Sequence, residues 1–178
     1  MSSPNWRVVV AVLACLLILL LVNLSIAGKE RLLTQGRVVY LQLAPVDPRS
    51  LMQGDYMALD FEVARAAMIA LSAPGTERGP LSEFRAEDGR IVVHLDDRSV
   101  ASFTRIADER PLAENEIVMR YRVRNGQLKF ATNAFFFQEG TGEQYQDARY
   151  GRFRIDAKGE MLLTMLCDER LHPLDGGT

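Results

Sequence analysis

Residues Val8–Val22 read VVVAVLACLLILLLV, an unbroken run of fifteen apolar side chains. The apolar character continues to Ala27, which gives about 20 residues, or about 30 Å of α-helix, one hydrocarbon thickness. Trp6 stands just before the run, and an amphipathic tryptophan suits the headgroup boundary. The run therefore predicts a transmembrane signal anchor over residues 8–27, preceded by a short tail over residues 1–7.

The side of the membrane on which the domain lies is predicted from the flanks of this run. A short tail with one arginine, an apolar core and the small residues Ser25 and Ala27 resemble an export signal. Cleavage before Gly28 is the alternative to an anchor. Lys29 and Arg31 favour a cytoplasmic domain by the positive-inside count, but that rule weakens for long domains. We expect a single-pass protein of a bacterial inner membrane with its soluble domain in the periplasm.

The composition limits the class of the remaining chain. The protein has 178 residues, 25% charged and 48% hydrophobic, which leaves one domain after the span and excludes wholesale disorder. With 21 basic against 23 acidic residues, a nucleic-acid-binding footprint is absent. Two cysteines and two histidines exclude a disulfide framework and argue against a metal site. We predict no metal and no cofactor.

Strand signals dominate after a polar connector at 28–36. Residues 38–43 are rich in β-branched and aromatic side chains, and apolar residues alternate from Tyr56 to Val63. Residues 64–71 predict a short helix, and prolines and glycines predict a mobile loop at 72–89. Further strands are predicted as three hairpins, 90–95 with 100–106, 116–123 with 127–131 and 152–155 with 161–167, and another strand begins at 135. The fold class is one N-terminal transmembrane helix followed by a mainly β, α+β domain over 37–178, an antiparallel sheet or barrel-like.

One octapeptide carries a family resemblance. Gly54–Phe61, GDYMALDF, resembles the signature that names the GDYXXLXY family of uncharacterised, membrane-anchored bacterial proteins. Phe61 replaces the last tyrosine of the signature, so the ring is kept and the hydroxyl is lost. Segments 43–53, 131–140 and 148–151 resemble further blocks of the family in order. The resemblance implies a one-span anchor, a domain outside the cytoplasm and a genetic association with multi-span membrane proteins, and it implies no reaction.

The same blocks contain the candidate binding residues. Gly54 suits a backbone conformation closed to other residues, and Asp55 can accept hydrogen bonds from turn N–H groups. Tyr56 has an apolar ring and a polar tip. A turn that fixes strand register is the simpler interpretation of this corner, and a binding corner is the alternative. The candidate binding residues are Gly54, Asp55, Tyr56, Glu139, Arg149 and Tyr150, with no catalytic residue and no metal ligand.

Three other features have competing interpretations. Glu139, Glu143 and Asp147 are spaced by four and would share one helix face, where they could hold a cation or host paired carboxylates. Glycines at 140 and 142 argue against that helix, and solvated charge is the simpler interpretation. In Phe135–Phe137 we expect core packing plus one ring that faces a partner. His94 is expected to be a partly buried structural residue.

These observations lead to two functional hypotheses. The first is a membrane-anchored accessory or protein-binding domain of the bacterial envelope, with a multi-span membrane or envelope protein as its partner and no reaction assigned. The alternative is a carboxylate-based hydrolase or cation-binding domain that uses Asp55, Glu139 and Glu143. An enzymatic activity is not favoured.

Overall fold

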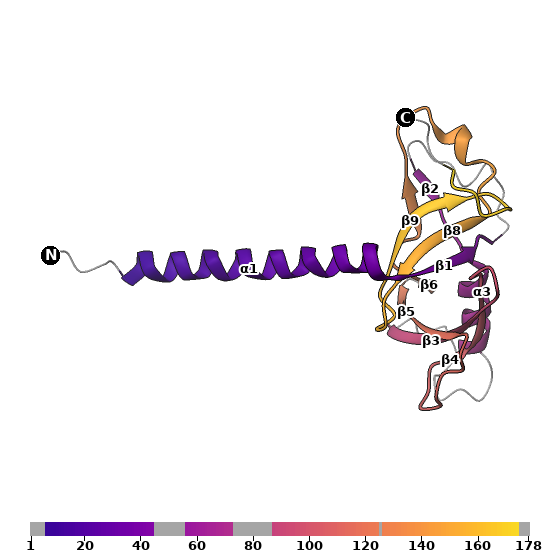
Figure 1. Cartoon of the computed structure of the whole chain (residues 1–178), viewed down its shortest axis with the longest axis horizontal. Helices are drawn as coiled ribbons and strands as arrows, with labels where there is room; N and C mark the ends of the chain where they lie inside the picture. The colour runs from indigo at the N-terminus through magenta and orange to yellow at the C-terminus, as the bar shows by residue number, and fades with distance from the viewer. Residues whose placement is uncertain (1–5, 45–55, 73–86, 125, 175–178) are drawn as a thin grey trace. The chain divides into compact units, whose positions relative to one another are not determined.

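The computed structural model describes residues 6–44, 56–72, 87–124 and 126–174 (Figure 1). The chain divides into two compact units, residues 1–35 and residues 36–178. In the first unit, helix α1 spans Trp6–Gln35, 30 residues or about 45 Å. Its most apolar window has a mean hydropathy of 3.0, so it is long and apolar enough to cross a membrane. The predicted anchor is therefore helical, and the helix continues through most of the predicted connector.

The second unit contains a three-stranded antiparallel sheet with the order β1-β8-β9. Its strands are β1 (Arg37–Gln42), β8 (Tyr150–Ile155) and β9 (Met161–Cys167). The predicted hairpin between the last two strands is confirmed. Its turn forms because Asp156 Oδ1 accepts hydrogen bonds from the N–H groups of Lys158 and Glu160, both at 2.9 Å, while Gly159 adopts a φ of +80°.

A four-stranded antiparallel sheet has the order β4-β3-β5-β6. It contains β3 (Glu87–Leu95), β4 (Ala101–Ile106), β5 (Glu116–Arg124) and β6 (Gln127–Lys129). Both predicted hairpins are confirmed. β3 begins at Glu87, so the end of the loop predicted at 72–89 belongs to this strand, and residues 73–86 lie outside the described part.

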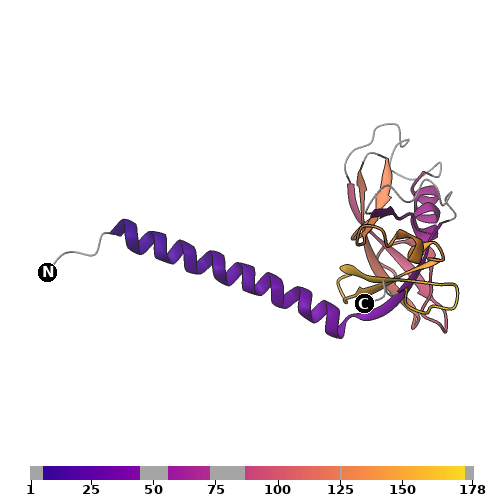
Figure 2. The same ribbon diagram turned by 90° about the horizontal axis from the view of Figure 1, so that it is seen from above.

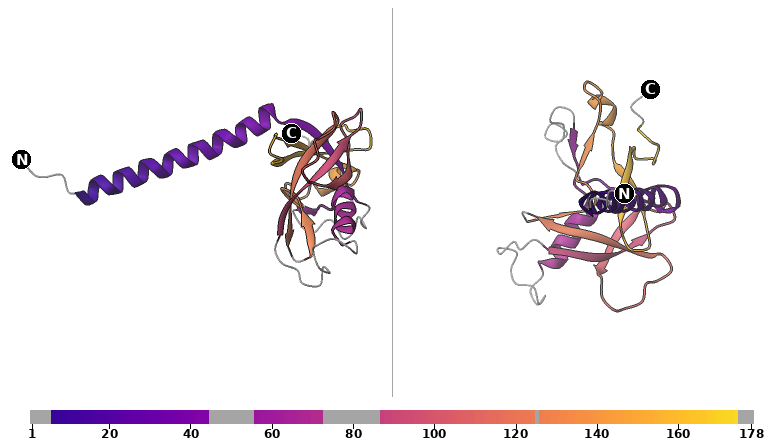
Figure 3. Two further views of the ribbon diagram at one scale, coloured as in Figure 1. Left: turned by 90° about the horizontal axis from the view of Figure 1, so that it is seen from below. Right: turned by 90° about the vertical axis from the view of Figure 1, so that its left-hand side faces the viewer.

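The two sheets join into a half-barrel. The N–H of Tyr40 in β1 donates to the carbonyl of Ser99, 2.9 Å away, before β4. The N–H of Arg120 in β5 donates to the carbonyl of Gly159, 3.0 Å away, in the β8–β9 turn. Helix α3 (Glu62–Leu71) contacts β1, β4 and β6 and lies against strands in Figures 2 and 3. The prediction of antiparallel, barrel-like architecture with little helix is confirmed.

A separate two-stranded ribbon pairs β2 (Tyr56–Ala58) with β7 (Ala134–Phe136). The predicted strand from Tyr56 to Val63 is therefore too long, because α3 begins at Glu62. The alternation is still real: Met57, Leu59, Phe61 and Val63 are all buried. The alternating burial continues through an extended link after β2. The chain then enters α3, which begins two residues earlier than predicted and contains strong helix-forming residues.

The core lies between the two sheets and α3. Its wholly buried side chains come from all of these elements and include Val39, Leu41, Phe61, Ile91, Val93, Met119, Phe153 and Leu166. Cys167 is buried, as expected. His94 is exposed rather than partly buried, because Val93 and Leu95 take the positions of β3 that face the core. The core therefore does not include His94.

Candidate functional site

Four segments that are far apart in the sequence meet around the end of the octapeptide. Leu43 forms an antiparallel bridge with Phe61, and its N–H donates to the carbonyl of Arg149, 2.8 Å away. The N–H of Leu59 donates to the carbonyl of Asn133 at 2.7 Å. We call this assembly the signature corner: residues 56–61 with 43–44, 133–136 and 148–151. Every block that resembles the family contributes backbone to it.

The aromatic ring of Phe61 is the centre of the signature corner. It is fully buried, 5.5 Å from the ring centroid of Phe153 and 6.0 Å from that of Phe130. Gly151 makes room for these rings, since a Cβ there would lie 3.0 Å from the ring of Phe153 and 3.2 Å from that of Phe61. The glycine of the last block and the aromatic residue of the octapeptide are therefore one packing unit.

Three phenylalanines in a row place rings on opposite sides of the ribbon. Phe135 packs its ring edge against Tyr145 at 5.1 Å, and Phe137 stacks on the same tyrosine at 5.4 Å. Phe136 points outward with 74% of its surface exposed, 5.8 Å from the ring of Tyr56. The expectation of core packing plus one outward ring matches this arrangement. Tyr56 and Phe136 form an aromatic pair at the surface, one from the octapeptide and one from a later block.

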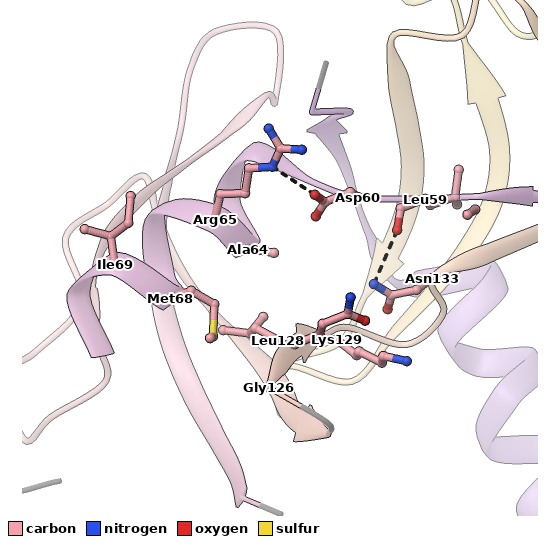
Figure 4. Close-up of a pocket in the computed structure, with 12 residues that line it drawn as sticks. Leu59, Asp60, Ala64, Arg65, Met68, Ile69, Gly126, Leu128, Lys129 and Asn133 are labelled. Atoms are coloured by element: carbon pink, nitrogen blue, oxygen red, sulfur yellow. Dashed lines mark hydrogen bonds and ion pairs between the residues drawn. The ribbon is translucent and has the colours of Figure 1, made fainter. Parts of the chain in front are cut away.

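A pocket of about 710 Å³ lies beside the signature corner (Figure 4). Its apolar wall comes from Ala58, Leu59, Ala64, Met68, Ile69 and Leu128. Its polar groups include Asp60, whose Oδ2 accepts from Arg65 Nε at 2.8 Å, and Asn133, whose Nδ2 donates to the carbonyl of Leu59 at 3.3 Å. None of the lining residues that the structure describes is Ser, Thr, Cys or His. The pocket offers shape, hydrogen bonds and charge.

The structure separates the predicted binding residues. Gly54 and Asp55 lie outside the described residues, and Tyr56 is half-buried in β2. Glu139 is exposed before Gly140, which has a φ of +81°. Arg149 is exposed, and its guanidinium donates to the carbonyls of Gln146 and Ala148, whereas Tyr150 is buried. The signature corner contains Tyr56, Arg149 and Tyr150 but not Glu139.

The three carboxylates spaced by four do not form a helical face. The only helix between Glu139 and Asp147 is the 3-10 turn η1 (Gly142–Tyr145), and Glu143 lies in it with an exposed side chain. In the described part of the chain, no group of three or more His, Cys, Asp or Glu residues could hold a metal ion. Asp55, the third residue of the hydrolase or cation-binding alternative, lies outside that part. No observation supports this alternative.

Neither of two carboxylates with a lowered pKa, Asp108 and Asp168, is one of the residues of the signature corner. Hydrogen bonding from Arg110 lowers the pKa of Asp108, which also forms an ion pair with Arg105. Burial raises the pKa of Asp168, but hydrogen bonds from the N–H groups of His172 and Arg170 and the charge of His172 outweigh it, so this pKa is also lowered. Each carboxylate also accepts hydrogen bonds from backbone two residues onward. These are turn-stabilising groups, not acid–base candidates.

The pocket was not predicted from the sequence. Its walls come from the end of β2, from α3 and from β6, and only the spacing of Asp60 and Arg65 is local. The pairing of β2 with β7 brings Asn133 next to Leu59, and no sequence pattern in either segment predicts that pairing. A non-local site of this kind leaves no signal in one sequence.

Comparison with known proteins gives a match to a family. A family model described as GDYXXLXY protein matches residues 18–166. The matched range takes in part of the apolar helix and nearly all of the strands. No curated protein and no solved structure matches the chain.

Proposed function

The chain belongs to the GDYXXLXY family, and from that premise we propose that it is a single-span accessory protein of the bacterial envelope. Helix α1 anchors it in the inner membrane, and the β-rich domain lies in the periplasm. There the domain binds another membrane or envelope protein, most simply a multi-span one. No reaction is assigned.

The observation that carries this proposal is the exposed ring of Phe136, which lies against the half-buried Tyr56. A phenylalanine with 74% of its surface exposed buries no comparable area in its own fold. Aromatic residues are enriched at the centres of protein–protein interfaces, where they contribute much of the binding energy. Tyr56 comes from the octapeptide and Phe136 from another block of the family, so the pair joins two of its most characteristic segments.

The anchor favours a partner in the same membrane. A domain held by one apolar helix meets other membrane proteins at a high effective concentration, so a modest surface is sufficient for association. The pocket beside the signature corner adds apolar area and hydrogen-bonding groups next to the segment that carries Tyr56. Both features serve binding.

Photocrosslinking tests the proposal directly. The full chain is expressed in its native membranes with p-benzoylphenylalanine at Phe136 or, as the control, at Leu112, which belongs neither to the signature corner nor to the pocket. Both side chains are open to solvent, with 74% of Phe136 and 47% of Leu112 exposed. We expect a defined crosslinked product of a membrane protein from position 136 and none from position 112. No product from position 136, or the same products from both positions, would contradict the proposal.

A further inference from the structure

Five basic side chains share the outer face of the four-stranded sheet. In β5, Arg120, Arg122 and Arg124 alternate with buried residues. Cross-strand pairing places Arg90 of β3 opposite Arg120, and Lys129 of β6 opposite Arg122. Residues paired in this way project to the same side of a sheet. The opposite side carries the buried residues of the core, so the basic side chains form one continuous surface, which we call the basic face.

The charges of the basic face are only partly balanced. Asp88 pairs with Arg124 at 2.8 Å, and Glu160 forms an ion pair with Arg120. Arg90, Arg122 and Lys129 make no ion pair with any side chain that the structure describes. Among the described side chains, these five cations and two anions leave a net charge of +3 on one face of a chain whose total charge is −2.

Like charges directly opposite each other destabilise a sheet. The basic face contains two such pairs, Arg90 with Arg120 and Arg122 with Lys129. On its other side Arg122 lies opposite Asp88, which offsets part of the second repulsion, whereas Arg90 and Arg120 have no acidic residue between them. An anionic ligand that lies across the strands would relieve both, and guanidinium groups bind phosphate oxygens with a matching, bidentate geometry.

The chain itself indicates which anion is within reach. The apolar segment ends at Ala27, α1 ends at Gln35 and β1 begins at Arg37. Eight helical residues rise about 12 Å. This short linker holds the domain close to the hydrocarbon boundary of the membrane. The distance is roughly the thickness of the headgroup layer plus one Debye length of about 8–10 Å, so the domain can feel the charge of the lipids. We propose that the basic face binds the phosphate groups of anionic lipids in the bilayer that α1 spans.

This inference rests on the proposed anchor, and it is tested on the full chain in nanodiscs. Cys15 is replaced by serine, and Cys167 is buried. A single thiol is then introduced at Gln127, which lies opposite Arg124 on the basic face, or at the exposed Glu143 in η1 as the positional control. Each thiol carries a fluorophore that a nitroxide on the lipid headgroup quenches. The discs contain phosphatidylcholine alone, or phosphatidylcholine and phosphatidylglycerol in equal parts.

The inference predicts a specific pattern of quenching. The probe at position 127 is quenched more strongly in the anionic discs than in the neutral ones, and about 1 M salt abolishes the difference. The probe at position 143 shows no such difference. Each basic residue near an anionic surface strengthens attraction about fivefold, so Arg90→Glu with Arg122→Glu weakens docking by at least about 30-fold. The pair Arg98→Glu with Arg170→Glu makes the same change in total charge elsewhere, and we expect it to leave docking intact.

Other outcomes overturn the inference. Equal quenching at position 127 in both kinds of disc would exclude lipid binding, and so would an equal loss in the two charge-reversal pairs. If docking to lipid is absent while the chain shows salt-sensitive binding to an acidic soluble protein, the basic face has a protein ligand instead. Should the double glutamate variant melt early, Arg90→Gln with Arg122→Gln replaces it, with about half the change in charge. Failure to enter discs at all would refute the anchor, a separate result.

Discussion

Gly89 lies directly opposite Tyr121 in the pairing of β3 with β5, and its missing side chain makes room for the phenol ring. A Cβ at this position would lie 2.5 Å from the ring and hydroxyl of Tyr121, far inside contact distance. Tyr121 is only 2% exposed, so its ring has no route to solvent. The sequence predicted that this glycine lies in a mobile loop at 72–89. In the structure it instead makes room for an aromatic residue in the core.

The variant Gly89→Ala should therefore lose stability. Overpacking of a buried ring costs about 1–3 kcal/mol, which lowers the Tm of the domain by several degrees. The melt is followed in mild detergent by near-UV circular dichroism. Tyr121→Leu removes the clashing atoms, so the two substitutions together should cost less than the sum of each alone. Additive costs would show that the ring is not what excludes the side chain.

A second prediction at this scale concerns acid stability. The pKa of Asp108 is lowered from its usual value of 3.8 by hydrogen bonding from Arg110 and by its ion pairs. A folded-state pKa below the unfolded one gives stability that is present above pH 3.8 and is lost as pH falls through the folded value. The Tm of the wild type should therefore decrease as the pH falls below about 3.8.

The variant Asp108→Asn tests the origin of this fall. Asparagine cannot titrate, so its Tm should depend less steeply on pH in the same acid range, with only a small loss at neutral pH because the group is exposed. Thermal melts between about pH 2 and pH 5 compare the two proteins. Parallel curves would show that other carboxylates cause the acid dependence. Asp168 would then be the next residue to test, because its pKa is also lowered.

At the scale of elements, local signals were reliable and non-local ones were absent. The turns at 96–99 and 156–159 and the glycine at 126, with a φ of +72°, mark hairpins whose strands are neighbours in the sequence. The strand from Tyr56 was predicted to run too far because period-2 burial does not distinguish a strand from an extended link. That β2 pairs with β7, and β1 with β8, depends on core packing between distant segments. The signature corner is built from those pairings, so its residues could be named but its geometry could not.

Adjacent phenylalanines of β7 offer a matched test of fold against function. Phe135→Ala removes a half-buried ring packed on Tyr145 and should cost roughly 1–3 kcal/mol. Phe136→Ala removes a ring that is 74% exposed and should change stability by less than about 0.5 kcal/mol. Thermal melts and detergent pull-downs measure both variants. We expect Phe136→Ala to keep its Tm and lose the partner, and an undiminished pull-down would remove the aromatic pair from the proposed interface.

For the molecule as a whole, the sequence correctly predicted a long apolar N-terminal helix followed by a mainly β domain, since an apolar run and strand periodicity are strong one-dimensional signals. The anchor in the membrane and the side on which the domain lies stay predictions. Fusions at Thr178 report the side: alkaline phosphatase is active only in the periplasm, and a fluorescent protein matures in the cytoplasm. We expect phosphatase activity without fluorescence. Fluorescence without phosphatase activity would place the domain in the cytoplasm, as the positive charges after the apolar run suggest on their own.

The pairing of β1 with β8 also determines when this domain can fold. Gly36 and Arg154, joined by a hydrogen bond, stand 118 residues apart in the sequence. Synthesis adds about 5–20 residues per second, so the first strand waits about 6 to 24 s for the one that completes its ladder. Contacts of such long sequence separation also slow the search itself. During that interval β1, which directly follows helix α1, presents an open strand edge to its surroundings, which makes the nascent chain a natural client for chaperones.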